Sequence, residues 1–171
     1  MRRIAIIASA SGNGKTTVGR ALADRLALPF VELDALVHGP GWSEVPDQDV
    51  RNRLAPVLAG EAWVIDGNYH SKLGNSVLRR ADAVVWLDLP IYVWLPRLIR
   101  RTFRRWYRRE ELWNGNREAL SSVLWGRDSL FVWAFRSHFR RRREWPKTLA
   151  QYPVIRLRTT EAVQKFLESA E

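Results

Sequence analysis

The sequence predicts an α/β fold with a five-stranded parallel sheet and helices on both of its faces. Short runs of β-branched residues alternate along the chain with longer helical patterns, which is typical of parallel, doubly wound sheets. A turn of small residues joins the first run to the first helix, where such folds bind phosphate groups. Because 171 residues are too few for two typical domains, we expect one domain over 1–171.

The first strand is expected at 4–8, because this apolar run is rich in isoleucine and suits burial on both faces. The first helix begins near Lys15 and ends before Pro29. Further strands are expected at 30–34, 63–67, 83–88 and 152–157, and further helices at 47–58, from Pro90 onward, at 118–140 and at 161–168.

The turn after the first strand follows the phosphate-loop pattern GxxxxGK[ST], except that Ser9 stands at the first glycine position. The glycines let successive N–H groups point at one anion, and the start of the helix adds positive charge. Lys15 would reach the β- and γ-phosphates of ATP, and the Thr16 hydroxyl would bind Mg²⁺. The residues expected to hold the nucleotide are Ser11, Gly12, Asn13, Gly14, Lys15, Thr16 and Thr17.

Two other interpretations of this stretch fit less well. A dinucleotide-binding GxGxxG turn ends in glycine, whereas Thr17 stands at that place. Arg2, Arg3 and the apolar run imitate a secretory signal, but the run is only about as long as the shortest apolar regions of such signals. The phosphate-loop residues also follow the run at once.

Carboxylates end the next predicted strands. Glu32 and Asp34 stand two residues apart, so in a strand they would share a face and point toward the phosphate loop, although solvated strand-end acids would look the same. Asp66 lies at the end of the third strand, which is the pattern of an acid that helps to hold Mg²⁺ beside a phosphate loop. We expect Thr16 to share Mg²⁺ with Glu32 or Asp66, and Asp88 is a further candidate.

Two loops are candidates for the side that binds the phosphate acceptor. The stretch 38–42 is a loop by its glycine and proline content, and its Trp42 either faces the substrate or caps the core. Asn68 and His70 belong to an active-site turn after the third strand. His38 and His70 lack metal-ligand spacing, so neither is expected to bind zinc.

The net charge of +10 is concentrated in residues 97–147, which contain 15 Lys or Arg residues but only five Asp or Glu residues. Arginines recur there at spacings of three and four, so several share one helix face. Ion pairs within the fold, a solvated face and a bound polyanion would each explain the surplus. We favour a lid with local ion pairs, because Trp125 and Trp133 lie on one helical face, which suits packing against the sheet. Oligonucleotide binding should then be weak, nonspecific and lost near physiological salt.

Composition excludes several classes of protein. The chain has no cysteine, which rules out disulfides, a cysteine zinc site and thiol catalysis. A membrane span needs roughly 20 apolar residues, and the best candidate, 83–95, is interrupted by Asp88 and Pro90. We therefore expect a cytoplasmic protein without a membrane partner.

Several of these stretches together resemble the P-loop kinases of nucleoside monophosphates and small molecules. The resemblance rests on the phosphate loop, on LDAL at 33–36, on WVIDGNY at 63–69 and on VVWLDLP at 84–90. These motifs are most similar to the adenylate-kinase-like group often labelled topology modulation protein. The resemblance covers nearly the whole chain, and it is specific for the superfamily but much weaker for the substrate.

The resemblance implies an ATP-dependent kinase with an arginine-rich lid at about 97–147. In such kinases an arginine at the position of Arg97 packs on the adenine, and one at the position of Arg101 contacts phosphates from a mobile lid. We therefore expect transfer of the γ-phosphate of ATP to a small-molecule or nucleotide acceptor. An ATP-gated nucleic-acid binder, or a kinase of nucleic-acid ends, is the alternative that the Arg- and Trp-rich segment suggests.

The resemblance also bears on the acceptor. The acids Glu32 and Asp34 are similar to the pair that binds Mg²⁺ and the acceptor hydroxyl in shikimate- and gluconate-type kinases, so Asp34 is the candidate base. Adenylate kinases have an arginine where this chain has His70, which argues against AMP as the acceptor.

Overall fold

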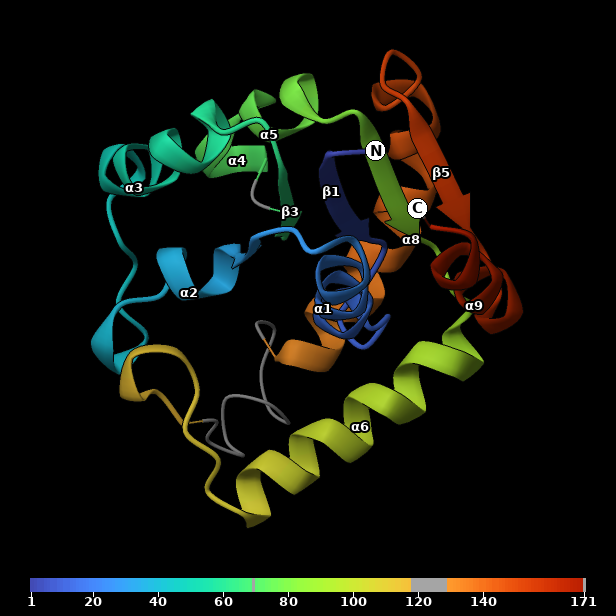
Figure 1. Ribbon diagram of the computed structural model, residues 1–171. Coiled ribbons are helices and arrows are strands. Elements are labelled where there is room, and N and C mark those ends of the chain that lie inside the picture. Colours follow the sequence, from blue (N-terminus) through green and yellow to red (C-terminus); the bar gives the residue numbers. More distant parts are fainter. Residues whose placement is uncertain (69, 118–128, 171) are drawn as a thin grey trace.

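In the computed structural model, five parallel strands form one sheet in the order β2-β3-β1-β4-β5 within residues 1–68, 70–117 and 129–170, the parts that the structure describes (Figure 1). The strands are β1 (Arg3–Ala8), β2 (Phe30–Glu32), β3 (Trp63–Asp66), β4 (Ala83–Leu87) and β5 (Val154–Leu157). All neighbouring pairs are parallel. The predicted sheet is thus confirmed.

The central strand is β1, which pairs with β3 on one side and β4 on the other. Ile4 lies opposite Val64 and opposite Ala83 in these two pairings. The strands that follow β1 in the sequence are therefore added on both sides of it. The carboxyl end of β1 lies at the point where the strand order changes from one side to the other. In open α/β sheets, ligands bind at this point.

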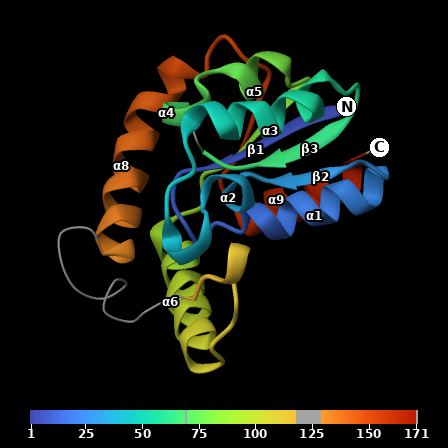
Figure 2. The same cartoon turned by 90° about the vertical axis from the view of Figure 1, so that its left-hand side faces the viewer.

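Helices cover both faces, as predicted (Figures 1 and 2). They are α1 (Lys15–Leu26), α2 (Leu33–Val37), α3 (Asp47–Ala59), α4 (His70–Leu73), α5 (Ser76–Arg80), α6 (Ile91–Tyr107), α8 (Leu130–Thr148) and α9 (Thr160–Ser169), with 3₁₀ turns η1 (Pro40–Trp42) and η2 (Trp113–Gly115). The helices α1 and α9 pack on one face, while α3, α5 and the end of α8 pack on the other.

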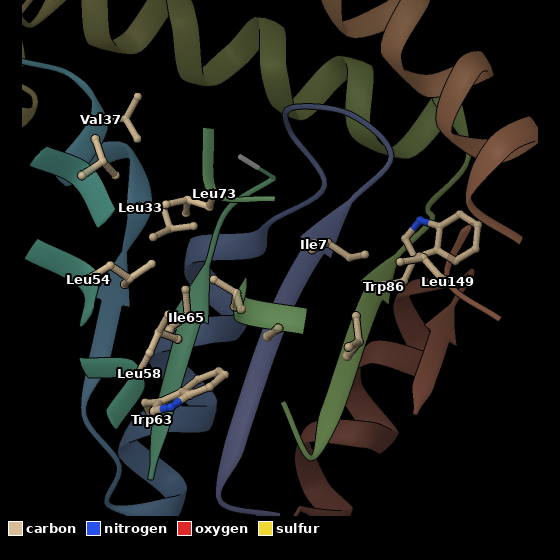
Figure 3. Close-up of a cluster of buried hydrophobic side chains, with 14 residues drawn as sticks. Ile7, Leu33, Val37, Leu54, Leu58, Trp63, Ile65, Leu73, Trp86 and Leu149 are labelled. Atoms are coloured by element: carbon tan, nitrogen blue, oxygen red, sulfur yellow. The ribbon is translucent and has the colours of Figure 1, made fainter. Parts of the chain in front are cut away.

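Side chains of β1 alternate between two hydrophobic clusters. Ile4 and Ile6 point toward α1 and α9, whereas Ala5 and Ile7 point toward α3 and the end of α8. Figure 3 shows the second cluster, in which Trp63 and Trp86 are almost fully buried. The isoleucine-rich run therefore reflects burial on both faces, which holds β1 rigidly at the centre of the sheet.

A third cluster joins the basic segment to the phosphate loop. Trp94 and Leu98 of α6 are buried with Ala134 of α8 and with Ala10 of the loop. Trp133 does not pack against the sheet as we had predicted: it is 44% exposed and lies beside Arg141 instead. The region 118–128, with Trp125 and the start of the helix predicted at 118–140, lies outside the described residues.

The second strand is shorter than predicted, because β2 ends at Glu32 and the chain turns directly into α2. Leu33 is buried against the backbone that leaves β3, where a Cβ atom on Gly67 would lie 2.7 Å from the Leu33 Cβ atom. Asp34 therefore belongs to the first turn of a helix. The prediction that Glu32 and Asp34 share a strand face is wrong.

None of the helices in the described part of the chain is long and apolar enough to cross a bilayer.

Candidate active site

The phosphate loop joins β1 to α1 and takes its shape from two glycines. Gly12 and Gly14 have φ values of +83° and +89°, in the left-handed region that favours glycine. At Gly12 a Cβ atom would also lie 2.5 Å from the carbonyl oxygen of Trp94, so the backbone of α6 lies directly against the loop. Gly14 precedes α1 without a side-chain cap, which leaves the first N–H groups of the helix for an anion.

The side chains predicted to bind Mg²⁺ meet beside this loop. The Thr16 hydroxyl donates to Asp66 Oδ2 at 2.7 Å and also lies 3.2 Å from Glu32 Oε1. Lys15 Nζ lies 3.8 Å from Asp66 Oδ1. Three segments that are far apart in sequence, the start of α1 and the ends of β2 and β3, thus bring a lysine, a hydroxyl and two carboxylates to one place.

Asp66 is a buried acid with a perturbed pKa. Its burial raises the pKa of the carboxyl group, and the nearby carboxylates of Asp34 and Glu32 raise it further, while Lys15 and the bond from Thr16 act in the opposite direction. Asp66 Oδ1 is buried and accepts no hydrogen bond. A buried carboxylate oxygen without a donor, close to further carboxylates, is suited to a divalent cation.

The donor set fits Mg²⁺ better than a metal that needs a full protein cage. Within the described residues, no three His, Cys, Asp or Glu side chains form a closed metal cluster. Mg²⁺ usually takes only one or two carboxylates, and water and substrate phosphates complete its shell. Thr16, Asp66 and Glu32 could supply the protein share of such a shell.

Asp34 reaches the site from the first turn of α2, since its charge acts on Asp66. One turn later, the His38 N–H donates to the Asp34 carbonyl at 3.2 Å. The helix thus brings Asp34 close enough to Asp66 for their charges to interact, although the strand geometry from which we expected this proximity was wrong.

The other predicted substrate residues are scattered. Both ends of the Asn68 side-chain amide bond the backbone of Ala8, at 3.0 and 2.9 Å, so this side chain extends the sheet and does not face a substrate. Trp42 is 40% exposed and caps no core; its indole N–H donates to the Arg117 carbonyl at 3.0 Å. His70 is the first residue of α4, but its side chain and Tyr69 lie outside the described part.

Asp88 is not suited to bind a metal. Its side chain is fully buried and accepts bonds from Ser9 Oγ at 2.6 Å, Arg142 Nε at 3.2 Å and Arg156 Nη2 at 2.6 Å. Two guanidinium groups and a hydroxyl therefore occupy both carboxylate oxygens. Of the three candidate magnesium acids, Asp66 and Glu32 lie at the phosphate loop beside Thr16, and Asp88 serves a structural ion-pair network.

The same network explains the unusual first residue of the loop. Ser9 Oγ donates to Asp88 and accepts the Trp86 indole N–H at 2.9 Å. Ser9 is fully buried, so its hydroxyl satisfies two polar groups that have no access to water. Glycine at this position would remove the hydroxyl that bonds both the Asp88 carboxylate and the Trp86 indole N–H.

Arg141 is a functional neighbour of the loop that sequence reasoning missed. It donates to the carbonyls of Ala8 and Ser9 at 3.1 and 3.4 Å, and its guanidinium group lies over the rings of Trp133 and Trp145. Burial lowers the pKa of Arg141 to about 10. Its helical spacing from the buried Ser137 and from Trp145 was the available signal, but it was hidden within four consecutive arginines.

The two predicted lid arginines lie on α6. Arg97 is exposed and lies about one helical turn after Trp94, whose carbonyl is close to Gly12 of the loop. Arg101 lies one turn after Arg97 on the same helix. Local ion pairs occur nearby, with Arg104 Nε 3.1 Å from Glu110 and Arg117 Nη2 3.8 Å from Glu111. The helix therefore runs outward from the phosphate loop with charged groups along its length.

Comparisons with known proteins agree with this architecture. Residues 11–40 match the family model of shikimate kinase. A curated shikimate kinase from Symbiobacterium thermophilum is 36% identical over 97 residues, which is 48% of this chain and 56% of that protein. The chain thus matches only about half the length of its curated relatives.

Solved structures match over nearly the whole chain. The shikimate kinase from Bacteroides thetaiotaomicron has a TM-score of 0.58 at 18% identity and is covered over 94% of its length by 98% of this chain. A gluconokinase from Sinorhizobium meliloti 1021 has a TM-score of 0.55 at 20% identity, with 89% of that chain and 99% of this one covered.

The fold and the phosphate loop are those of the P-loop kinases. The match of residues 11–40 to shikimate kinase and the similarity to curated shikimate kinases are consistent with the superfamily of nucleoside and small-molecule kinases that the motifs predicted. The narrower resemblance to the topology modulation group stays a prediction.

Replacing Ser9 by glycine should restore the usual loop pattern and yet destabilise the protein. The Ser9→Gly variant removes a bond from each of two buried groups, at a cost of about 1–3 kcal/mol of unfolding free energy. Urea unfolding, with Ser169→Gly at the exposed end of α9 as the control, measures the loss. Unchanged stability of Ser9→Gly would show that this hydroxyl is not needed.

The Asp66→Asn variant should be more stable than the wild type without ligand, because it no longer buries a charge whose pKa is raised by burial. The gain should be present above that raised pKa and should shrink as pH falls from it toward the ordinary value of 3.8, because Asp66 becomes protonated in the folded protein over this range. Stabilisation by Mg·ATP should be largely lost. Thermal unfolding with and without Mg·ATP tests both effects, with the exposed Asp24→Asn as the control; full Mg·ATP stabilisation in Asp66→Asn would contradict a metal role.

Proposed function

We propose that the protein is an ATP-dependent kinase that transfers the γ-phosphate of Mg·ATP to a hydroxyl group of a small-molecule acceptor. The observation that carries this proposal is the meeting of Lys15, Thr16, Asp66 and Glu32 beside the phosphate loop, with Asp34 next to them. Phosphoryl transfer depends mostly on positioning and charge neutralisation, and this group supplies both.

Each residue has a distinct part in binding the donor. The loop amides and Lys15 hold the β- and γ-phosphates, and Thr16, Asp66 and Glu32 provide oxygens for Mg²⁺, which neutralises phosphate charge when bound. Because Asp66 is buried and lacks a donor at Oδ1, the cation would remove an unfavourable charge from the site. Arg97 and Arg101 of α6 are proposed to cover the nucleotide.

Asp34 is the proposed base. The acceptor hydroxyl oxygen forms a bond to the γ-phosphorus while the bond from phosphorus to the bridging oxygen breaks, so ADP leaves and the hydroxyl proton passes to the carboxylate of Asp34. Asp34 lies near Asp66 but on the separate element α2, which suits contact with the acceptor instead of the metal.

Similarity supports a small-molecule acceptor. The curated relatives are shikimate kinases, and a gluconokinase shares the fold. These relatives favour a hydroxylated small molecule over a nucleic acid as the phosphate acceptor. Screening hydroxy acids, sugars and nucleosides for acceptor-dependent ADP release would identify the class.

In the Lys15→Ala variant, the affinity for Mg·ATP or the turnover should fall by a large factor. The loop would lose the ammonium group that contacts the β- and γ-phosphates. Calorimetric titration with Mg·ATP and an ADP-release assay measure the two effects. Lys165→Ala, an exposed lysine on α9, is the matched control. Equal binding and activity in Lys15→Ala and wild type would refute the assignment of the loop.

The Asp34→Asn variant should lower kcat, with the affinity for Mg·ATP nearly unchanged, because an amide cannot accept the proton. General base catalysis contributes about 10²–10⁴-fold, which sets the expected loss. Asp24→Asn on the exposed side of α1 controls for the change of charge. If the only defect lay in Mg·ATP binding, Asp34 would instead belong to the metal site.

A further inference from the structure

The segment that follows α6 turns back to the helix that carries Asp34. We call residues 108–117 the lid arm; it contains η2 (Trp113–Gly115). The arm lies against the stretch between α2 and α3 (Figure 1). It thereby connects α6, which touches the phosphate loop at Gly12, with the acceptor side of the site.

Two asparagines of the arm make this contact through hydrogen bonds. The Asn116 side chain is buried, donates to the Gly39 carbonyl at 2.9 Å and accepts the Trp42 N–H at 2.8 Å. The Asn114 side chain donates to the carbonyls of His38 and Ala35. Asn116 therefore bridges both sides of the turn that follows α2, and Asn114 caps the carbonyl end of the helix.

Aromatic rings seal the same contact. The Trp113 ring is stacked on His38 with ring centres 6.1 Å apart, and the edge of Trp42 meets both rings. The arm thus presents one indole and two amides to a stretch of only five residues, 38–42. Because each hydrogen bond has a fixed donor and a fixed acceptor, these bonds define a single position of the arm relative to residues 38–42. Apolar contacts alone would allow the two segments to slide.

The helix α2 needs such support. It has five residues, and a helix of this length is not stable on its own. Leu33 and Val37 anchor its buried side, while the Ala35 carbonyl accepts a bond from Asn114 of the arm and the Val37 carbonyl accepts the Val45 N–H at 3.0 Å. Asp34 is in the first turn, so a shift of the carbonyl end would move the carboxylate relative to the phosphate loop.

We propose that Asn114 and Asn116 are positioning residues that hold α2, and with it Asp34, at the distance from the phosphate loop that transfer requires. This inference rests on the proposed function for its kinetic part. The lid segment then has two roles: α6 contacts the donor side at Gly12, and the arm fixes the acceptor side. Donor and acceptor groups are set by one continuous piece of chain.

Hydrogen exchange tests the positioning without any substrate. In Asn116→Ala, amides of residues 33–39 should exchange faster than in the wild type, while those of α1 should not change. Asn52→Ala is the matched control, because this exposed asparagine accepts a bond from Gln48 on its own helix, far from the arm. Asn114→Ala removes an exposed amide and should act in the same direction if Asn116→Ala folds poorly. Unchanged exchange at 33–39 in both arm variants would overturn the proposal, whether or not the protein is a kinase.

Kinetics distinguish positioning from general structural support. With the acceptor that gives the fastest ADP release, or with water if none does, Asn116→Ala should lower kcat at least about tenfold, since small displacements of reacting groups are costly. Its affinity for Mg·ATP should stay within about twofold of the wild type, because positioning of the base leaves donor binding intact.

A double-mutant cycle completes the test. In the Asp34→Asn background, Asn116→Ala should cause little further loss, because both changes act through the same carboxylate. Equal losses in both backgrounds, or a parallel loss of Mg·ATP affinity, would overturn the positioning role. Failure of the kinase proposal would appear separately, as Lys15→Ala with unchanged Mg·ATP binding.

Discussion

The phosphate loop touches the backbone of α6 so closely that only glycine fits at position 12, and the rest of the site depends on this contact. Asn13 holds the loop from within, since its side chain donates to the Ala10 carbonyl and accepts the Leu89 N–H. Arg141 holds the entrance from α8. The loop is therefore fixed by the elements around it, so Lys15 and Thr16 face Asp66 from a defined position.

Most of the fold could be predicted because the strands are buried on both faces and leave apolar runs that local pattern reveals. The boundary between β2 and α2 could not, because the local pattern of Phe30 to Asp34 fits a strand that continues past Glu32. The close approach of Gly67 to Leu33 decides it, and this contact joins residues that are far apart in the sequence. Tertiary packing overrides local preference at such places.

The nucleotide side of the site could be predicted for the same reason: its motif is continuous, and Asp66 ends a recognisable strand. Residues whose partners lie far away in the sequence could not be identified in this way. Charged side chains are exposed in most proteins, so the helical spacing of Arg141 was too weak a signal to show that it binds carbonyls, and Asp88 gave no sign that it anchors Ser9. Asn68 and Asn116 look alike in sequence, yet one extends a strand and the other bridges a turn.

The two helices of the basic segment both return to the phosphate loop. Trp94 and Leu98 of α6 meet it at Gly12, and Arg141 of α8 meets it at Ala8 and Ser9. The chain between these anchors is a closed excursion that starts and ends at one rigid point. Closing a longer loop costs only slightly more entropy than closing a shorter one. Changes in the length of this excursion should therefore cost little stability, provided that both anchors at the phosphate loop are kept.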